Sequence, residues 1–467
     1  MKLGLNRTVS NFKKALKKAS SFLNTYSLDF DGVDDRLSLP EVVYSGAFTF
    51  SFWAKPNSLS LAFVCGDYNS NGYFVWLFST TRIILKTSGG SYNFQESGGN
   101  NIIIGDWQNI VITRDSSNNI NCYVNGVSFG TTGNLGGNFE FNSIGKVYSA
   151  SSSWYFNGGI DEFAVWDNDQ SLNIATISTA PTVDLSSLNP TQWYRMGDNG
   201  AYKSPQFLLP NNENKDKISN YSFEFDGVDD YVNCGVNLAF ATVPNLSISY
   251  WIKTDATLTN FASYFSIGVN VSYVGGAYNY SAGRLYKTGT GLVVYIQGAG
   301  SSSGSTLLDD GNWHHIIQTY SDNGNNTSRV RIYVDGNTTP EVDLASTLSY
   351  APLTSNLFIG ARNASADRGF PGSVDEVSVW DSVLSTSDIT AIWNSGTPTT
   401  ISGAIAHYKM GEEATFSTNW TVPDAAGSND GTSANMTIED RVGEAPNSEN
   451  NALSFNMDEV DRVEDTP

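Results

Sequence analysis

Two aspartates at matching places in the chain are candidates for binding a cation. Asp161 lies in the run GIDEFAVWD and Asp375 in the run SVDEVSVWD, and each alternates with apolar residues. Because alternate residues of a β-strand share a face, we expect both carboxylates to point inward with the apolar side chains. A bare buried carboxylate is strongly destabilising, so each needs hydrogen-bond donors or a cation.

Calcium is the cation that suits these residues, because it prefers carboxylate and carbonyl oxygens. The turns at Asp31 and Asp226, each within a run FDGVDD, offer further carboxylates and carbonyls. We therefore predict structural Ca²⁺ held by aspartates of this set. The alternative is that each Asp accepts hydrogen bonds from backbone amides of its own turn.

Aromatic side chains in three segments are candidates for binding sugars or a neighbouring subunit. Residues 66–100, 128–156 and 256–309 are rich in Gly, Ser, Asn and Tyr, and variable loops on a rigid scaffold often carry binding. The alternative is ordinary loop packing. The candidate residues are Trp154, Tyr155, Tyr273, Tyr278, Tyr280 and Tyr286.

Catalytic patterns are absent from the sequence, so we predict that the protein is not an enzyme. A glycosidase needs two carboxylates that flank one bond. Asp161 and Glu162 are adjacent, as are Asp375 and Glu376, so we expect each pair to point to opposite faces of its strand. Three His and three Cys show no zinc-type spacing, and no phosphate loop or serine nucleophile motif occurs.

Internal repetition shows how these residues are positioned. Six sequence blocks occur twice in the same order, among them FDGVDD, the hairpins YVNG and YVDG, and the two Asp-containing runs. Within the blocks apolar residues alternate, as at Phe48, Phe50 and Phe52, and Asn-Gly or Asp-Gly follows a strand. The sequence therefore predicts an all-β chain with two copies of one antiparallel two-sheet sandwich.

The ordered blocks resemble the laminin G-like, concanavalin A-like lectin/glucanase superfamily over most of the chain. The resemblance implies two tandem jelly-roll sandwiches, frequently with a structural calcium ion, in which the opening and closing strands lie near one another. It therefore implies one Ca²⁺ on Asp31 and Asp161 and one on Asp226 and Asp375. The family includes sugar binders, adhesion modules and spacers, so it fixes no single function.

Composition excludes several classes of protein. The chain has 26 Lys and Arg against 47 Asp and Glu, a net charge of −21, so we predict no nucleic-acid partner. No apolar run is long enough to predict a membrane span, and no signal peptide is apparent at the start. Cys65, Cys122 and Cys234 cannot all pair, so no disulfide framework is expected.

The first 24 residues differ from the rest because they are basic. Leu5, Val9, Phe12 and Leu16 form the apolar stripe of a short amphipathic helix. Such a helix needs a surface to fold against. That surface is the acidic body of the same chain, a larger assembly, or a membrane or nucleic acid.

The remaining segments divide the chain further. We predict an anchor at 1–24, sandwiches at 25–177 and 219–396, a linker at 178–218 with a WYRMG strand, and an acidic segment at 397–467 with an HYKMG strand. Residues 454–463 echo the opening of a copy, so the tail is a truncated third copy or packs on the second. The linker and the ending also resemble structural proteins of marine tailed bacteriophages.

Together these observations lead to one functional prediction and two alternatives. We predict a non-enzymatic virion structural or attachment protein, joined to other virion subunits by residues 1–24, forming a homo-oligomer or larger assembly and binding host-surface glycans. The first alternative is a bacterial extracellular or cell-surface carbohydrate-binding protein. The second is an accessory domain of a glycan-degrading enzyme.

Overall fold

The computed structural model describes most of the chain after the first 23 residues. The predicted amphipathic helix of residues 1–24 therefore lies outside the described residues except for Asn24. The structure describes residues 24–467 apart from 131, 180–182, 199, 204–205, 215–216, 236–244, 255–261, 264, 268–283, 286–292, 297–299, 325–326, 347–355, 362–363, 365–368 and 449.

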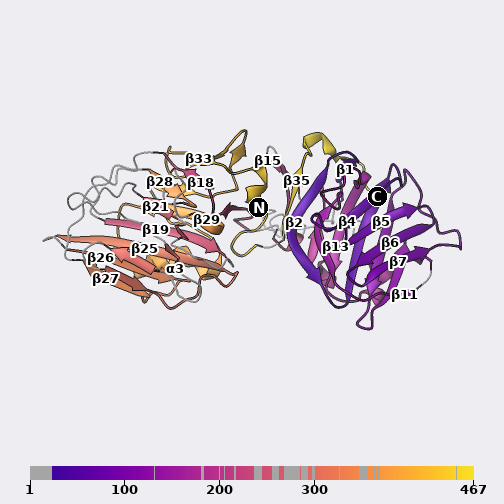
Figure 1. The fold of residues 1–467 in the computed structure, drawn as a ribbon, viewed down its shortest axis with the longest axis horizontal. Helices are drawn as coiled ribbons and strands as arrows, with labels where there is room; N and C mark the ends of the chain where they lie inside the picture. The colour runs from indigo at the N-terminus through magenta and orange to yellow at the C-terminus, as the bar shows by residue number, and fades with distance from the viewer. Residues whose placement is uncertain are drawn as a thin grey trace, which may run out of the picture. The chain divides into compact units, whose positions relative to one another are not determined.

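The chain forms two compact units, and one of them is discontinuous in sequence (Figure 1). Unit 1 comprises the described residues up to Tyr202 together with Gln206–Lys215 and Ala452–Pro467. Unit 2 comprises Asp216–Asn451 with Lys203–Pro205. No helix in the described part of the chain is both long and apolar enough to cross a membrane.

Two antiparallel sheets make up unit 1. The first has the order β10-β9-β8-β3-β13-β1-β36, with β11 beside β9 and β14 beside β13, and the second has the order β15-β16-β35-β2-β12-β4-β5-β6-β7. The strands of the first are β1 (Ser27–Asp31), β3 (Phe48–Pro56), β8 (Gln108–Arg114), β9 (Asn119–Val124), β10 (Val127–Ser128), β11 (Gly133–Asn134), β13 (Asn157–Trp166), β14 (Gln192–Tyr194) and β36 (Arg462–Val463). Those of the second are β2 (Arg36–Tyr44), β4 (Ala62–Gly66), β5 (Phe74–Ser79), β6 (Arg82–Thr87), β7 (Gly90–Gln95), β12 (Phe139–Ile144), β15 (Ala201–Lys203), β16 (Gln206–Leu209) and β35 (Ala452–Phe455).

Unit 2 repeats this plan. Its first sheet has the order β27-β26-β25-β19-β29-β17-β34 with β30 beside β29, its second β21-β28-β18-β33-β32-β31, and a smaller one β20-β22-β23-β24. The strands are β17 (Ser222–Asp226), β18 (Tyr231–Asn233), β19 (Asn245–Lys253), β20 (Ala262–Ser263), β21 (Phe265–Ile267), β22 (Arg284–Leu285), β23 (Val293–Ile296), β24 (Gly300–Ser303), β25 (Trp313–Gly324), β26 (Thr327–Val334), β27 (Val342–Ser346), β28 (Leu357–Ile359), β29 (Pro371–Trp380), β30 (Ala406–Tyr408), β31 (Thr415–Phe416), β32 (Trp420–Val422), β33 (Gly431–Ala434) and β34 (Arg441–Val442).

Helical structure is short wherever the chain is described, so the prediction of an all-β protein is confirmed. The α-helices are α2 (Ile174–Ile177) and α3 (Thr386–Trp393), and each follows the closing strand of its unit. Ser385 begins α3 with a capping box to Asp388, which satisfies backbone amides of the first turn. The 3-10 turns are η1 (Ser171–Asn173), η2 (Leu185–Leu188), η3 (Asn212–Asn214), η5 (Asn394–Gly396), η6 (Ile438–Asp440) and η7 (Glu459–Asp461).

The core of each unit lies between its two larger sheets. In unit 1 the alternating Phe48, Phe50 and Phe52 of β3 are fully buried, as the period of two predicts. Phe52 and Phe141 stack on opposite sides of Phe163, with ring centroids 5.6 and 5.5 Å from it. Apolar side chains from both sheets thus meet in one cluster.

The end of the chain completes unit 1, which corrects the prediction for residues 397–467. Strand β35 lies between β16 and β2, and β36 pairs with β1. In Figure 1 the yellow β35 lies beside the indigo β2. The tail is therefore neither a third copy nor an addition to the second. The segment that precedes it, from β30 to β34, belongs to unit 2, and the predicted linker supplies β14 and β16 to unit 1.

The true counterpart of the tail is found within unit 2. Strand β33 lies between β32 and β18, as β35 lies between β16 and β2, and β34 pairs with β17. The pattern S-x-N-M followed by D-R-V is shared by residues 433–442 and 454–463. Ser433 and Ser454 each accept a hydrogen bond from a backbone amide of the neighbouring strand, at 2.8 and 2.7 Å. We call these matched segments clips.

The clips show that unit 2 is inserted into unit 1. In unit 2 only residues 423–430 separate β32 from β33. In unit 1 the same connection, from β16 to β35, contains Asp216–Asn451, which is nearly all of unit 2. The two copies are therefore nested in the chain rather than joined end to end.

The methionines of the two clips, Met436 and Met457, are only 21 positions apart in the sequence, but we expect each to stabilise a different unit. Met457 is 1% exposed in the core of unit 1, and Met436 is 3% exposed in the core of unit 2. Met457→Ala should lower the free energy of unfolding of unit 1 by about 2–5 kcal/mol through the cavity that it leaves. Hydrogen exchange resolved by peptide measures this change for each unit.

Met436→Ala is the matched control, and it should weaken unit 2 while leaving exchange in β2, β12 and β16 unchanged. Faster exchange in unit 2 on replacing Met457, with unit 1 unaffected, would contradict the nested arrangement.

Candidate functional site

Three carboxylates lie close together at the closing strand of each unit, two on the strand and one from a turn elsewhere in the chain. In unit 1 they belong to Asp161, Glu162 and Asp198, with a ligand atom of each within 4.8 Å of the others. We call this set the unit 1 trio. Asp161 is fully buried on β13, but the prediction that it shares a face with Phe163 and Val165 is wrong. It is opposite Trp53 of β3, whereas the neighbouring Ile160 is opposite Ala54 in the core, and a register shift before Ala164 separates Asp161 from the core-facing Phe163 and Val165.

The neighbouring Glu162 is also buried, contrary to the prediction that the pair points to opposite faces. Its φ is +45°, and the register of β13 on β3 shifts between Asp161 and Ala164. This bulge breaks the alternation of a regular strand and turns both carboxylates to one place. Glu376 in unit 2 repeats the feature with a φ of +49°.

Asp198 reaches the unit 1 trio from the turn after β14. Gly197 permits the approach, because a Cβ there would lie 2.3 Å from the Cβ of Tyr26. Asp198 Oδ1 accepts a hydrogen bond from the backbone N–H of Thr25 at 3.0 Å. The motif WYRMGD therefore brings the third acid to the strand, a role that its sequence did not indicate.

Arginine neutralises much of the unit 1 trio. Arg195 Nε donates to Glu162 Oε1 at 3.0 Å, and its Nη2 lies 3.8 Å from Asp198 Oδ2. Trp193 Nε1 donates to Glu162 Oε2 at 2.6 Å, and Asn24 Nδ2 donates to Asp161 Oδ2 at 2.8 Å. Cation and donors together satisfy the buried acids.

The unit 2 trio comprises Asp375, Glu376 and Glu412, again with ligand atoms within 4.8 Å of one another. Ser219 Oγ lies 2.8 Å from Asp375 Oδ2 and 3.0 Å from Glu412 Oε1. Glu412 Oε1 also accepts from the backbone amide of Asn220 at 2.7 Å. Its other oxygen, Oε2, is buried and has no hydrogen-bond partner.

The basic residue that contacts the unit 1 trio, Arg195, has a counterpart in unit 2 that points elsewhere. Lys409 takes the place of Arg195 in the motif HYKMGE, but its Nζ lies 3.2 Å from Glu413, at the surface. His407 replaces Trp193, and its Nε2 lies 2.6 Å from Glu376 Oε2. At Glu376 a histidine thus takes the position that Trp193 occupies beside Glu162 in unit 1.

One further cation acts on this trio. The Arg441 guanidinium lies over the rings of Tyr221 and Trp420, and its charge and that of Glu412 influence one another. Its Nη1 donates to the carbonyl of Ala414 at 3.3 Å. Arg441 therefore offsets part of the negative charge of the trio.

Burial governs the protonation of both trios. It raises the pKa of Asp161 and of Asp375 well above the ordinary range, and the neighbouring carboxylates add to the effect. Burial also raises the pKa of Glu162 to about 7, against the lowering influence of Arg195. The pKa of Glu412 rises to about 7 through burial and the charge of Glu376.

The predicted pairing of Asp31 with Asp161 at one ion is wrong. Asp31 lies opposite Asn157 in the β1–β13 register, four residues before Asp161 on β13. At about 3.3 Å per residue the two acids are separated by roughly 13 Å along the strand. Asp226 lies opposite Pro371, so Asp226 and Asp375 are separated by the same distance.

The alternative prediction for the opening turns, that each Asp accepts hydrogen bonds from backbone amides of its own turn, is confirmed. Asp31 Oδ1 accepts hydrogen bonds from the backbone amides of Val33 and Asp34 at 2.7 and 3.3 Å. Asp226 makes the same bonds in unit 2. Each carboxylate thus fixes its own turn.

A second candidate site lies on the outer face of the second sheet of unit 1. Phe63 of β4 lies between the indoles of Trp76 and Trp154, with both centroid distances 4.5 Å. Phe74 and Phe78 of β5 flank Trp76 at 6.3 and 4.6 Å. We call these five residues the aromatic face. Trp76 and Trp154 are half-buried, and Phe78 is exposed.

Two of the predicted aromatic candidates lie at or beside this face. Trp154 is part of it, and Tyr155 lies under Lys146, whose Nζ is 3.7 Å from the ring centroid. The strand residues of the face were missed, although the alternating run FVWLF at 74–78 was a usable signal. Tyr273, Tyr278, Tyr280 and Tyr286 lie outside the described residues.

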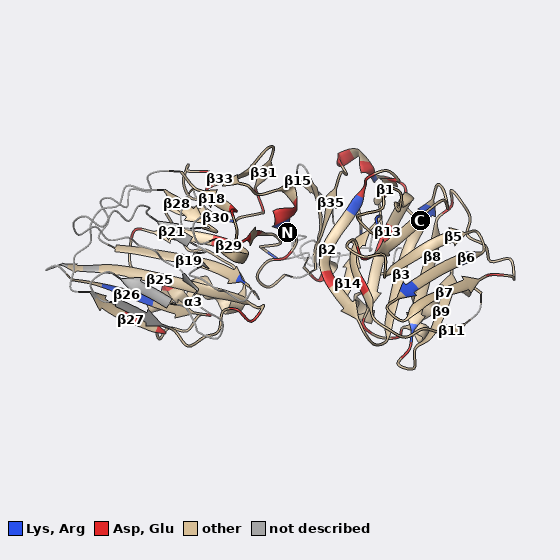
Figure 2. Cartoon of the chain, in the orientation of Figure 1, with Lys and Arg blue, Asp and Glu red and all other residues tan. Residues whose placement is uncertain are grey.

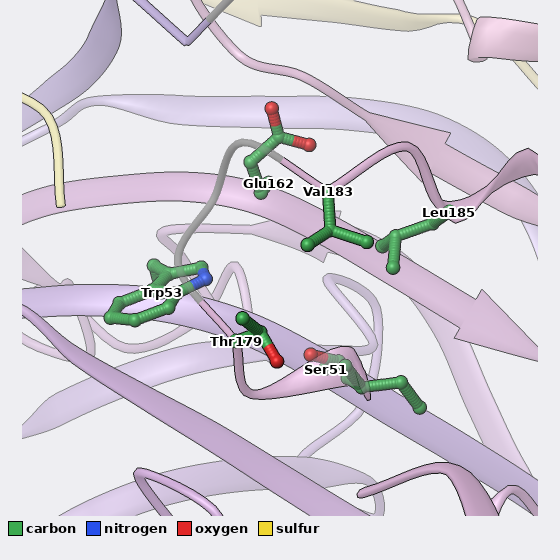
Figure 3. A pocket seen from close by; sticks show the side chains of 7 residues that line it. Ser51, Trp53, Glu162, Thr179, Val183 and Leu185 are labelled. Carbon is green, nitrogen blue, oxygen red and sulfur yellow. The ribbon is translucent and has the colours of Figure 1, made fainter. Parts of the chain in front are cut away.

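A small hollow beside Glu162 has no room for a sugar. Its cavity of about 10 Å³ holds about one water molecule (Figure 3). In unit 2 the counterpart of Trp53 is Trp251, and Trp393 stacks on it with ring centroids 5.3 Å apart. The hollow is lined by Ser51, Trp53, Glu162, Ile177, Thr179, Val183 and Leu185.

A family model described as the Concanavalin A-like lectin/glucanases superfamily matches residues 31–178 and 226–390. Among curated proteins, the chain is 24% identical over 182 residues to the sushi, von Willebrand factor type A, EGF and pentraxin domain-containing protein 1 of Rattus norvegicus. That alignment covers 38% of this chain and 5% of the relative, so the chain spans a small part of that protein.

Solved structures match over longer stretches. A proposed carbohydrate-binding protein from Bacteroides ovatus is 13% identical, with 90% of this chain and 99% of that chain covered and a TM-score of 0.35. Domains LG4-5 of the mouse laminin alpha1 chain are 12% identical, with 76% and 88% covered and a TM-score of 0.25.

We expect the two matched bases to contribute very differently to stability. Arg195→Met leaves the buried Glu162 without its cation, so the free energy of unfolding of unit 1 should fall by about 3–5 kcal/mol at neutral pH. Chemical denaturation followed by hydrogen exchange in β13 and β14 checks this.

Lys409→Met is the control, because the Lys409–Glu413 pair is exposed and such pairs contribute about 0–1 kcal/mol. Equal losses from the two substitutions would show that Arg195 does not neutralise the trio.

Proposed function

The chain belongs to the concanavalin A-like lectin/glucanases superfamily, and from this membership we propose that it is a carbohydrate-binding protein without catalytic activity. The ligand binds on the aromatic face of unit 1. The single observation that carries the proposal is the outward stack of Trp76, Phe63 and Trp154.

The chemistry of sugars suits this surface. A pyranose ring exposes C–H groups on its faces, and these pack on the half-exposed indoles of Trp76 and Trp154. Aromatic side chains provide large contact areas at a low cost in conformational entropy. The face stands on strands of a continuous sheet, which holds the rings in position before a ligand arrives.

The acids of the closing strands are poorly placed for hydrolysis. Asp161 and Asp375 are fully buried, and Glu162 and Glu376 nearly so. A general acid or nucleophile must reach the bond that it cleaves. Burial of the trios therefore supports a binding protein rather than a glycosidase.

The virion and host-attachment roles stay predictions, as does the assembly of the chain into a homo-oligomer or larger particle. They depend on residues 1–24, which lie almost wholly outside the described part of the chain. None of the relatives described above is a virion protein. The first alternative, an extracellular or cell-surface carbohydrate-binding protein, agrees with the proposal made here.

Calcium suits the unit 2 trio better than the unit 1 trio. In unit 2 the buried Glu412 Oε2 has no partner, and hard oxygen ligands are those that calcium prefers. In unit 1 the Arg195 guanidinium contacts two of the three acids and would repel a cation. We therefore propose one Ca²⁺, held by Asp375 and Glu412, in place of the two predicted from the sequence.

Substitution of either tryptophan of the aromatic face should strongly weaken carbohydrate binding. We expect Trp76→Ala and Trp154→Ala each to weaken binding by about 2 kcal/mol or more, a factor of about 30, as for other buried aromatic contacts. A glycan array identifies a ligand, and titration calorimetry measures its affinity.

Tyr123→Ala is the control, since Tyr123 faces outward from the other sheet of unit 1 and should leave affinity unchanged. An array without any hit, or affinities that Trp76→Ala does not change, would refute the proposal.

Acidity and calcium should act on unit 2 in opposite ways. The folded-state pKa of Glu412 is about 7 against an ordinary value of 4.5, so without metal the unfolded chain loses its proton first. The free energy of unfolding of unit 2 should then fall as pH rises from about 4.5 to about 7. Calcium should restore it above pH 7, where the carboxylate is ionised. Thermal unfolding with calcium and with a chelator measures both effects.

Glu412→Gln should remove the response to calcium and reduce the pH dependence, part of which Asp375 retains, whereas Asp198→Asn in the unit 1 trio should leave both in unit 2. Calcium that fails to raise the melting temperature of unit 2 at pH 8 would exclude the ion.

A further inference from the structure

The aromatic face continues onto two neighbouring strands as a surface without acids. Across the β5–β6–β7 register, Trp76 is opposite Ile84, which is opposite Asn93. Residues that alternate with these on each strand share the outward face. The outward residues of the three strands are Phe74, Trp76, Phe78, Arg82, Ile84, Lys86, Ser91, Asn93 and Gln95, and none is Asp or Glu.

Two cations lie at the border of the aromatic rings. The Arg82 guanidinium is 5.0 Å from the ring centroid of Phe78, and Lys86 Nζ is 5.4 Å from that of Phe74. Arg82 Nε donates to Gln95 Oε1 at 3.0 Å, and Lys86 Nζ donates to the Asn71 carbonyl at 2.7 Å. These contacts hold both heads over the sheet.

Neither cation is neutralised within the described residues, where no carboxylate forms an ion pair with Arg82 or Lys86. The chain's acids outnumber its bases by 47 to 26, and Figure 2 shows how sparse the basic residues are. Other described bases, such as Lys55 and Lys253, pair with an acid, whereas Arg114 and Lys146 contact carbonyls and rings.

The acids of the same sheet gather at its other half. Glu140 of β12 is opposite Val43 of β2, and burial and the charges of Asp67 and Glu140 raise the pKa of Glu41 on β2. Strand β4 lies between β12 and β5, and the nearest of these acids to β5 is Glu140, whose hydrogen bond raises the pKa of Tyr73 just before that strand. The outer face is therefore divided into an acidic half and a half that is aromatic and cationic.

The cationic half matches an anionic ligand with apolar rings. Arg presents a planar fork that pairs with carboxylate or sulfate through two hydrogen bonds, and Lys adds a point charge. Exposed Ser91, Asn93 and Gln95 offer hydrogen bonds to hydroxyl groups. A nucleic acid would be repelled by the net charge of −21 over its greater length.

We propose that the aromatic face binds an acidic oligosaccharide, with Trp76 against a sugar ring and with Arg82 and Lys86 paired to its carboxylate or sulfate groups. This inference rests on the carbohydrate binding proposed above and names its ligand class.

The test compares charged and neutral forms of one sugar on the full chain. Titration calorimetry uses trigalacturonate against its methyl ester, and a sulfated hexasaccharide against its desulfated form. The acidic forms should bind at least tenfold more tightly, with an affinity that falls as salt screens the charges. Arg82→Gln and Lys86→Gln should each weaken the acidic form about tenfold and leave the neutral form unchanged.

Lys409→Gln, which removes an exposed cation of unit 2, should change neither affinity. Equal affinity for charged and neutral sugars, both lost in Trp76→Ala, would overturn this inference and leave the proposed function intact. Absence of binding to every sugar would overturn both. Acidic sugars that still bind Trp76→Ala, or an oligonucleotide of equal charge that binds as tightly, would show unspecific ion pairing and overturn the inference.

Discussion

The second sheet of each sandwich is completed by a strand from near the C-terminal end of its unit, β35 in unit 1 and β33 in unit 2. In unit 1, β35 lies in the interior of the second sheet, and without it β2 and β16 would have unpaired backbone groups inside the sheet. The clip that carries this strand also contributes Met457 to the core and pairs β36 with β1. Hydrogen bonding of the sheet, packing of the core and order of the opening turn thus depend on the same sixteen-residue segment, Ala452–Pro467.

The second constraint is electrostatic, because the closing strands β13 and β29 each bury carboxylates. Unit 1 meets the charge with Arg195, whereas unit 2 has exchanged this residue for Lys409 and directs it to the surface. The second copy instead sets His407 against Glu376 and Ser219 against Asp375 and Glu412. The two copies share one backbone arrangement but place different side chains against their buried carboxylates.

Much of the fold was predictable because it follows from local patterns. Alternation along β3 predicted its buried face, and the paired blocks predicted two copies. The burial of Asp161 was predicted, but the face on which it lies was not, because a bulge follows it on β13. That bulge, which brings Glu162 beside Asp161, depends on a positive φ that the residue type does not indicate. Asp198 and the clips escaped prediction because their partners lie far away in sequence and only the completed sheets bring them together. Of the aromatic face, the sequence indicated only Trp154, because binding was sought in loops and the other four rings project from strands.

Nesting also changes how the protein responds to proteases. Unit 2 is connected to unit 1 at both of its ends, so a single cut in either connection leaves the two units covalently joined through the other. Release of unit 2 requires two cuts. A tandem arrangement would lose a whole unit at the first cut. Nesting therefore gives the chain a tolerance of single cuts that fusion at a terminus does not provide.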